Sequence, residues 1–171
     1  MILMFNKFKS VLTIFTVTMS LALNSYALPS DSEQEISIAS DTASLNKLQG
    51  ELIYSGNVEL IQGSLIIQAD KVTLIRNEKG MQQLIANGKP ARYEQVLSTN
   101  EGKTHAYGET IIYNVMNDEL TLIKNAGLKK QGNVFAGEKI VYLIKEQRVK
   151  ADSTKQDRVR MVIQPKTDKE P

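Results

Sequence analysis

The chain has 171 residues, with 21 basic and 19 acidic side chains and no cysteine. This length fits a single domain that can bury a core of its own. Without cysteine neither a disulfide nor a thiolate metal site can form, and the nearly balanced charge gives little support to nucleic-acid binding.

The N-terminus has the pattern of a secretory signal peptide. Lys7 and Lys9 precede an apolar run over residues 11–23, and Ser25 and Ala27 are small residues at the third and first positions before a cut. An uncleaved membrane anchor is the alternative, but this run is short for a bilayer that needs about 20 apolar residues. We therefore expect residues 1–27 to be removed, which leaves an exported chain with 19 basic and 19 acidic residues.

Residues 28–35 are polar and are predicted to form a flexible lead-in. The first strand follows, because Ile36 and Ile38 alternate with Ser37 and Ala39. This strand and the last one are predicted to be the open edges of the fold.

The stretch over residues 55–74 contains three short segments of period-two alternation, which is typical of strands and not of helices. Gly56-Asn57 and Gln62-Gly63-Ser64 are predicted to be the turns between them. The stretch is interpreted as a short β-meander with one apolar face.

A pattern of a small residue, an acid and an alternating apolar pair occurs four times, and its acids are Asp41, Asp70, Glu109 and Glu138. Such a repeat predicts stacked hairpins that bury a face only against their neighbours. The acids are expected to accept hydrogen bonds from turn N–H groups at strand entries. The alternative is a catalytic carboxylate pair, Asp70 and Glu109, which would have to meet in one cleft.

Toward the C-terminus, residues 143–150 are interpreted as a strand and a turn that leave the last repeat. The final strand is predicted where Val159, Met161 and Ile163 alternate with basic residues. The sequence therefore predicts an all-β domain over residues 36–164, followed by a disordered tail over residues 165–171.

No catalytic or metal-binding pattern is found. His105 is the single histidine, has no second metal-type ligand at a recognised spacing, and is interpreted as a surface loop residue. Gly102-Lys103-Thr104 is similar to the end of a phosphate-binding loop, but Leu97 occupies the place of its first glycine. We expect no enzyme, no metal and no cofactor.

The order and spacing of several short words identify the chain as similar to the OstA-like (LptA) family of periplasmic lipopolysaccharide-transport proteins. The words are Ser40-Asp41, Ser55-Gly56-Asn57-Val58, Gln62-Gly63, Ala69-Asp70-Lys71-Val72, Gly88-Lys89-Pro90-Ala91 and Gly137-Glu138-Lys139-Ile140. The resemblance implies a single β-jellyroll of antiparallel strands, folded into a slightly open V of two sheets. It also implies that lipopolysaccharide acyl chains lie between these sheets, in the periplasm.

Alternation phase assigns a set of residues to the inward, lipid-binding face: Ile36, Ile38, Tyr54, Leu60, Ile67, Leu74, Tyr93, Ile111, Tyr113, Leu122 and Tyr142. The assignment of Ile111 and Tyr113 competes with one that points Ile112 inward. By the family pattern, Arg76 is a candidate to contact a lipid A phosphate, and Lys71 and Lys139 are further candidates.

The resemblance further implies end-to-end pairing with related jellyrolls, an LptC-type inner-membrane protein and an LptD-type outer-membrane protein. We expect the first to pair with the N-terminal edge, Ile36, Ser37, Ile38 and Ala39. We expect the second to pair with the C-terminal edge, Val159, Met161 and Ile163. Because the edges differ, self-association would be head-to-tail.

Residues 77–83 and 98–103 depart most from the family pattern. A β-solenoid scaffold or adhesin-like structural protein of the envelope is the alternative to a lipid carrier. An enzyme of envelope polysaccharide is a further alternative.

Overall fold

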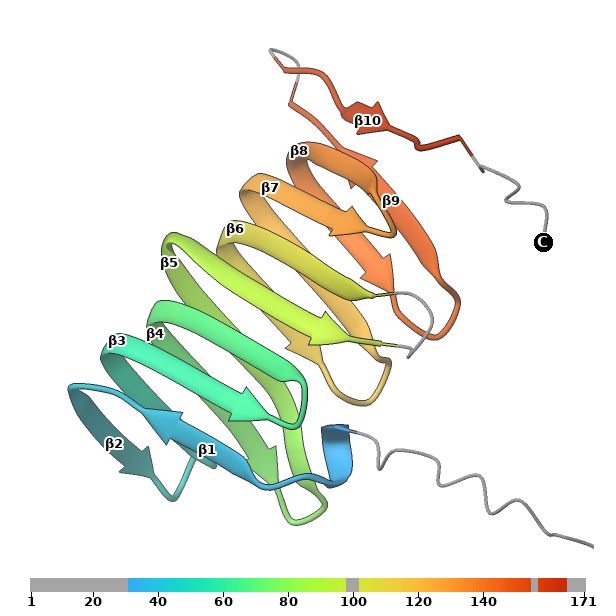
Figure 1. The fold of residues 1–171 in the computed structure, drawn as a ribbon. Helices are drawn as coiled ribbons and strands as arrows, with labels where there is room; N and C mark the ends of the chain where they lie inside the picture. The colour runs from blue at the N-terminus through green and yellow to red at the C-terminus, as the bar shows by residue number, and fades with distance from the viewer. Residues whose placement is uncertain (1–30, 98–101, 155–156, 166–171) are drawn as a thin grey trace, which may run out of the picture.

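The computed structural model describes residues 31–97, 102–154 and 157–165 (Figure 1). The predicted signal peptide, the loop residues 98–101 and nearly all of the predicted tail lie outside these ranges. No helix in the described ranges is long and apolar enough to span a membrane.

One antiparallel sheet of ten strands makes up the fold, in the order β1-β3-β4-β5-β6-β7-β8-β10. In addition, β2 pairs with β3, and β9 pairs with β8. The elements are η1 (Asp31–Glu33), β1 (Ile36–Ala39), β2 (Thr42–Asn46), β3 (Glu51–Gln62), β4 (Leu65–Asn77), β5 (Gly80–Val96), β6 (Lys103–Asn114), β7 (Glu119–Lys130), β8 (Asn133–Leu143), β9 (Arg148–Asp152) and β10 (Arg160–Val162). The prediction of an all-β fold of antiparallel hairpins with unclosed edges is confirmed.

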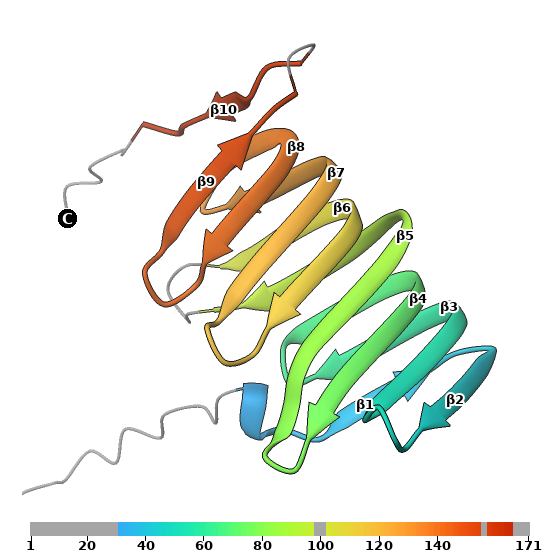
Figure 2. The same ribbon diagram turned by 180° about the vertical axis from the view of Figure 1, so that it is seen from behind.

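Every long strand bends near its middle. The pairing registers shift at Ser55/Val58, Gln68/Lys71, Asn87/Ala91, Tyr107/Thr110 and Ile123/Ala126. Irregular pairing of this kind bends a strand without ending it. Figures 1 and 2 show the bends stacked along one side of the molecule, with the hairpin turns on the opposite side. We call the bent side the corner row and the opposite side the mouth.

The corner row divides the sheet into two facing limbs. The first limb contains β1, β10 and residues 58–62, 65–69, 91–96, 103–108, 126–130 and 133–137. The second limb contains β2, β9 and residues 51–55, 71–77, 80–87, 110–114, 119–123 and 139–143. The core lies between the two limbs.

The corners correct the predicted meander. Gly56-Asn57 is not a turn between two strands but the bend within β3, where both residues have positive φ, 82° and 47°. A Cβ on Gly56 would lie 2.1 Å from the Asp41 carboxylate, so glycine is required there. The predicted segments at 65–67 and 72–74 are both parts of β4. Local alternation cannot distinguish a bend from a reversal, whereas the predicted turn at Gly63 is a true hairpin turn.

Two of the four repeated acids have different partners from those predicted. Asp41 accepts a hydrogen bond from the side-chain amide of Asn57, and Glu109 accepts one from Asn125, both at 3.0 Å and 16 residues along the chain. Asn57 and Asn125 have positive φ, so each acid is tied to the bend of the neighbouring strand and not to a turn N–H group.

The two ends of the sheet also differ from the prediction. Each end has two edge strands, because β1 and β2 both pair with β3, and β9 and β10 both pair with β8. The segment 143–150, predicted as a strand and a turn, contains the end of β8, a turn and the start of β9, which continues to Asp152. The strand β10 is shorter than predicted, since Val159 and Ile163 lie outside it. Pairing with β8 covers only three residues there.

The lead-in, predicted to be flexible, is structured from Asp31 onward. The turn η1 is held by the Asp31 carboxylate, which accepts bonds from Ser64 N and Ser64 Oγ, both at 2.7 Å, and from Gln95 Nε2 at 2.6 Å. Gln62 Nε2 also donates to the Gln34 carbonyl, at 3.1 Å. Side chains far along the chain supply these bonds, so local composition could not reveal them.

Candidate functional site

The inward side chains form an apolar interior between the limbs. Seven of the assigned residues are buried: Leu60, Ile67, Leu74, Tyr93, Ile111, Leu122 and Tyr142. The other four, Ile36, Ile38, Tyr54 and Tyr113, are half-buried and pack against the same core. Ile111 is fully buried whereas Ile112 is partly exposed, so the inward phase of this strand is the predicted one.

Cross-strand register aligns these residues in continuous rows. In the second limb a deep row, next to the corners, consists of Tyr54, Val72, Ala86, Ile111, Leu122, Ile140 and Ala151. A rim row, nearer the mouth, consists of Leu52, Leu74, Leu84, Tyr113, Leu120, Tyr142 and Val149. The opposite row, in the first limb, consists of Ile38, Leu60, Ile67, Tyr93, Ala106, Leu128, Phe135 and Met161.

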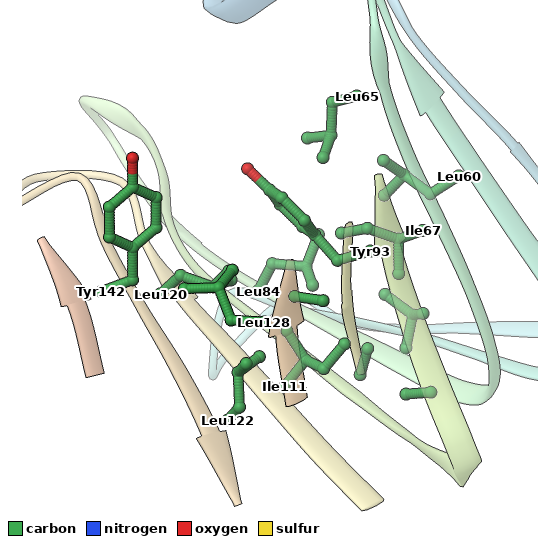
Figure 3. Packing of buried hydrophobic residues seen from close by; sticks show 14 of the residues in the cluster. Leu60, Leu65, Ile67, Leu84, Tyr93, Ile111, Leu120, Leu122, Leu128 and Tyr142 are labelled. Carbon is green, nitrogen blue, oxygen red and sulfur yellow. The ribbon is translucent and has the colours of Figure 1, made fainter. Parts of the chain in front are cut away.

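The interior changes from apolar to polar in the direction of the mouth. Figure 3 shows the hydroxyl groups of Tyr93 and Tyr142 pointing the same way, away from Ile111, Leu122 and Leu128. Tyrosine suits such a boundary, because its ring packs against apolar neighbours while its hydroxyl finds a polar partner.

The hydroxyl groups of Tyr93 and Tyr113 each donate a hydrogen bond to a polar side chain at the mouth. Tyr93 donates to the amide oxygen of Gln95, and the amide nitrogen of Gln95 donates to the Asp31 carboxylate. Tyr113 donates to Asp118 at 3.0 Å. Burial, followed by nearby acidic groups and tyrosines, raises the pKa of Tyr93 well above its ordinary value, and burial and Asp118 also raise the pKa of Tyr113. Both phenols therefore stay protonated as hydrogen-bond donors at neutral pH.

Lys130 adds a positive charge to the mouth. Its ammonium nitrogen lies 2.9 Å from the Tyr142 hydroxyl oxygen and 5.4 Å from the centre of the Tyr142 ring. Lys130 is in the first limb and Tyr142 is in the second, so this contact joins the limbs across the mouth.

At the N-terminal end the interior opens into a cavity of about 310 Å³, lined by Ile36, Ile38, Leu52, Tyr54, Leu74, Arg76 and Met81. The cavity lies between β1 and the second limb. Arg76 is exposed and places its cation beside these apolar side chains.

The three cations proposed from the sequence do not come together. Lys71 and Lys139 are exposed and directly precede the inward residues Val72 and Ile140, so they face outward beside the corner row. Arg76 is five positions after Lys71 in β4, which corresponds to a distance of roughly 17 Å along the strand at the usual rise per residue. Only Arg76 of this set lies at the cavity.

Sequence reasoning missed two polar groups at the mouth. Lys130 is two residues after the buried Leu128 in β7, so alternation alone would have placed it on the inward face. Asp31 offered no such signal, because it precedes every strand and its partners are 33 and 64 residues away.

The residues considered as catalytic candidates in the sequence, Asp70, Glu109 and His105, do not form a common site. Asp70 lines a shallow outer hollow with residues of β3, β4 and β5, whereas Glu109 contacts Asn125 and Lys124 in β7. His105 lies on the outer face of β6, not in a loop, 3.2 Å from a Glu94 oxygen. Within the described ranges no group of three or more acidic or histidine side chains could hold a metal ion.

Comparison with known proteins gives a consistent result. The family model described as "LptA/(LptD N-terminal domain) LPS transport protein" matches residues 37–148. The lipopolysaccharide export system protein LptH of Pseudomonas aeruginosa is 40% identical over 90% of this chain and 93% of its own length. The lipopolysaccharide export system protein LptA of Escherichia coli K12 is 33% identical over 94% of this chain and 87% of its own.

A solved structure agrees with these matches. The crystal structure of LptH from Pseudomonas aeruginosa, described as the LptA-homologous periplasmic component of the lipopolysaccharide transport device, is similar with a TM-score of 0.73. It is 40% identical and covers 80% of this chain and all of its own. The resemblance carried by the short words of the sequence is thereby confirmed.

Proposed function

The chain belongs to the LptA/(LptD N-terminal domain) family of LPS transport proteins, and from this membership we propose that it is a periplasmic lipopolysaccharide carrier. It holds acyl chains between its limbs and forms one part of a bridge from the inner to the outer membrane. It performs no reaction.

The observation that carries the proposal is the two-limbed interior, apolar toward the corners and polar at the mouth. Its rows are made of aliphatic and aromatic residues with one methionine, and they run through the whole sheet without a charged residue. An amphipathic glycolipid needs this combination, since its acyl chains avoid water while its sugar and phosphate groups stay hydrated.

Entry of acyl chains requires the limbs to separate. In the middle of the sheet Ile67, Leu84 and Leu120 have no exposed area, so the resting interior is filled by its own side chains. The cavity at the N-terminal end offers a first place for an apolar chain, with Arg76 beside it to pair with a lipid A phosphate. Acyl chains would then replace side-chain contacts between the limbs.

Site-specific photo-crosslinking in cells tests this binding mode. A photoreactive residue at Tyr113, in the rim row, is expected to capture lipopolysaccharide. The same residue at Lys71, outside the limbs near a corner, is expected to capture much less. Equal capture at both positions, or capture at neither, would refute a groove between the limbs.

The edge strands support end-to-end partners. In β1 the exposed Ser37 and Ala39 carry no charge, and Ile36 and Ile38 line the cavity. In and beside β10, Val159, Met161 and Ile163 are 38%, 52% and 68% exposed. The uncharged β1 edge would accept another strand readily, because backbone bonds supply affinity and apolar side chains continue the interior. The β10 edge carries Arg160, so it would pair more selectively. An LptC-type jellyroll would join the β1 end, and an LptD-type jellyroll the β10 end.

Light scattering over a range of concentrations tests the edges. The wild-type chain is expected to form rods that lengthen with concentration, since a head-to-tail contact does not close. Deletion of residues 157–171 should shorten them, and Ile36→Pro should weaken docking at the other end by removing a backbone donor. A strict monomer at high concentration, with both variants still functional in cells, would refute the bridge without refuting lipid binding.

A further inference from the structure

The hydrogen bond between Lys130 and Tyr142 has a geometry that could hold the mouth closed. Lys130 pairs in the sheet with Asn133, and Tyr142 pairs with Leu120, so no backbone pairing brings the two side chains together. They meet because Lys130 is at the tip of the first limb and reaches the rim row of the second. The resulting hydrogen bond of 2.9 Å spans the opening that a lipid must use.

The two groups differ in how easily they can find other partners. A lysine ammonium is a compact charge with three donors, and it binds phosphate oxygens by charge-assisted hydrogen bonds. A phenol oxygen is an uncharged acceptor and therefore the weaker partner. A phosphate that reaches the mouth can replace Tyr142 as the acceptor for Lys130.

We propose that Lys130 and Tyr142 form a latch across the mouth, and that a phosphate-bearing lipid headgroup opens it by binding Lys130 in place of Tyr142. The inference rests on the proposed function, and it adds a headgroup site at β7 that is separate from Arg76. With the bond broken, the Tyr142 ring and its neighbour Leu120 are free to move away from Leu128, and the first acyl chain enters between the limbs.

The chain supplies well-matched variants for a test. Lys130→Met removes the charge but keeps an unbranched side chain of similar length. Tyr142→Phe removes the oxygen acceptor and keeps the ring. Lys129→Met alters the neighbouring lysine, which is exposed on the outer face of the same strand. Lys130→Arg restores a cation at the site.

The measurement compares two fluorescent lipids, a bisphosphorylated lipid A and its dephosphorylated form, binding to the purified exported protein. The wild-type protein is expected to prefer the phosphorylated lipid by roughly tenfold. Lys130→Met should reduce this preference to within about twofold, while Lys129→Met and Lys130→Arg should keep it. Stopped-flow association should be several times faster for Tyr142→Phe than for wild type, because the latch is already open.

The outcomes separate the latch from the function. If wild-type protein binds neither lipid, both proposals fail. If it binds, but Lys130→Met keeps the full preference or Tyr142→Phe associates no faster, the latch alone is overturned. A merely structural contact would slow or weaken binding in both variants, and this too overturns the latch. If inorganic phosphate itself speeds entry of the dephosphorylated lipid, a free anion and not a headgroup opens the mouth, and the proposal as stated fails.

Discussion

The interior is hollow at one end and closed at the other. Near β1 a cavity of about 310 Å³ separates Ile36 and Ile38 from the second limb. Near β8 the limbs are in contact, with Ile140 fully buried and Lys130 bonded to Tyr142 across the mouth. The comparison indicates that the N-terminal end is the less costly place to insert an apolar chain.

The largest expected effect comes from a buried charge at each end. Ile140→Asp should lower the free energy of unfolding by about 4 kcal/mol, because the carboxylate has no partner in a closed interior. Ile38→Asp should cost only about 1 kcal/mol, because the cavity lets water reach the carboxylate. Urea denaturation of both variants measures the difference. Equal losses would show that the two ends are packed alike.

Polar contacts at the mouth should rank in the opposite order, because the contacts of Asp31 at the N-terminal end are part-buried and that of Lys145 is exposed. Asp31→Ala removes three bonds that hold η1 on the β3–β4 turn and on β5, and a loss of about 1–2 kcal/mol is expected. Lys145→Ala removes a 2.7 Å pair with Asp118, but the lysine side chain is 75% exposed, so we expect a loss below about 0.5 kcal/mol. Thermal unfolding of the two variants gives the ranking. A larger loss for Lys145→Ala would contradict the role assigned to η1.

Alkaline pH tests whether the middle of the mouth is closed. The pKa values of Tyr93 and Tyr113 are raised in the folded state, mainly by burial. The unfolded chain therefore loses these protons first, and stability should fall as the pH rises above the ordinary tyrosine value of about 10. A variant with Tyr93→Phe and Tyr113→Phe should show a flatter decline in denaturation experiments from pH 8 to about 11. An unchanged slope would mean that other groups control alkaline unfolding.

The smallest effect on stability is expected at the hollow end. Arg76→Glu changes an exposed side chain, so the melting temperature should stay within about 2 °C of wild type. Lipid binding should nevertheless weaken, because the cation beside the cavity becomes an anion. Calorimetry and a fluorescent-lipid titration measure the two quantities. Unchanged affinity would make Arg76 an ordinary surface cation.

Alternation within each limb was enough to predict the inward face, although the inward phase changes at the corners of β4 and β5. Ile67, Ile111 and Leu122 follow period two without exception, and all three are buried. The short motifs at the corners were also recognised in the sequence, but they were interpreted as turns between strands and not as bends within them. Gly56-Asn57 has the composition of a turn, and only the pairing on both sides of it shows that β3 continues.

What sequence reasoning missed depends on contacts between distant residues. The role of Asp31 follows from Ser64 and Gln95, and that of Lys130 from the opposite limb. A strand and a turn were predicted over residues 143–150, but only pairing with β8 shows that the turn precedes the edge strand β9. Local pattern thus predicts which way a side chain points, but not which distant group it meets.

The unbroken rows have a consequence for movement along the interior. Neighbouring strands lie about 4.8 Å apart, and at each step the deep row presents another aliphatic or aromatic side chain at the same depth, from Tyr54 through Ile111 to Ala151. An acyl chain that slides by one strand loses contacts behind it and regains similar ones ahead. A shift by one strand therefore exchanges one set of apolar contacts for another. Another protomer added in register at β9 and β10 would lengthen the rows of both limbs.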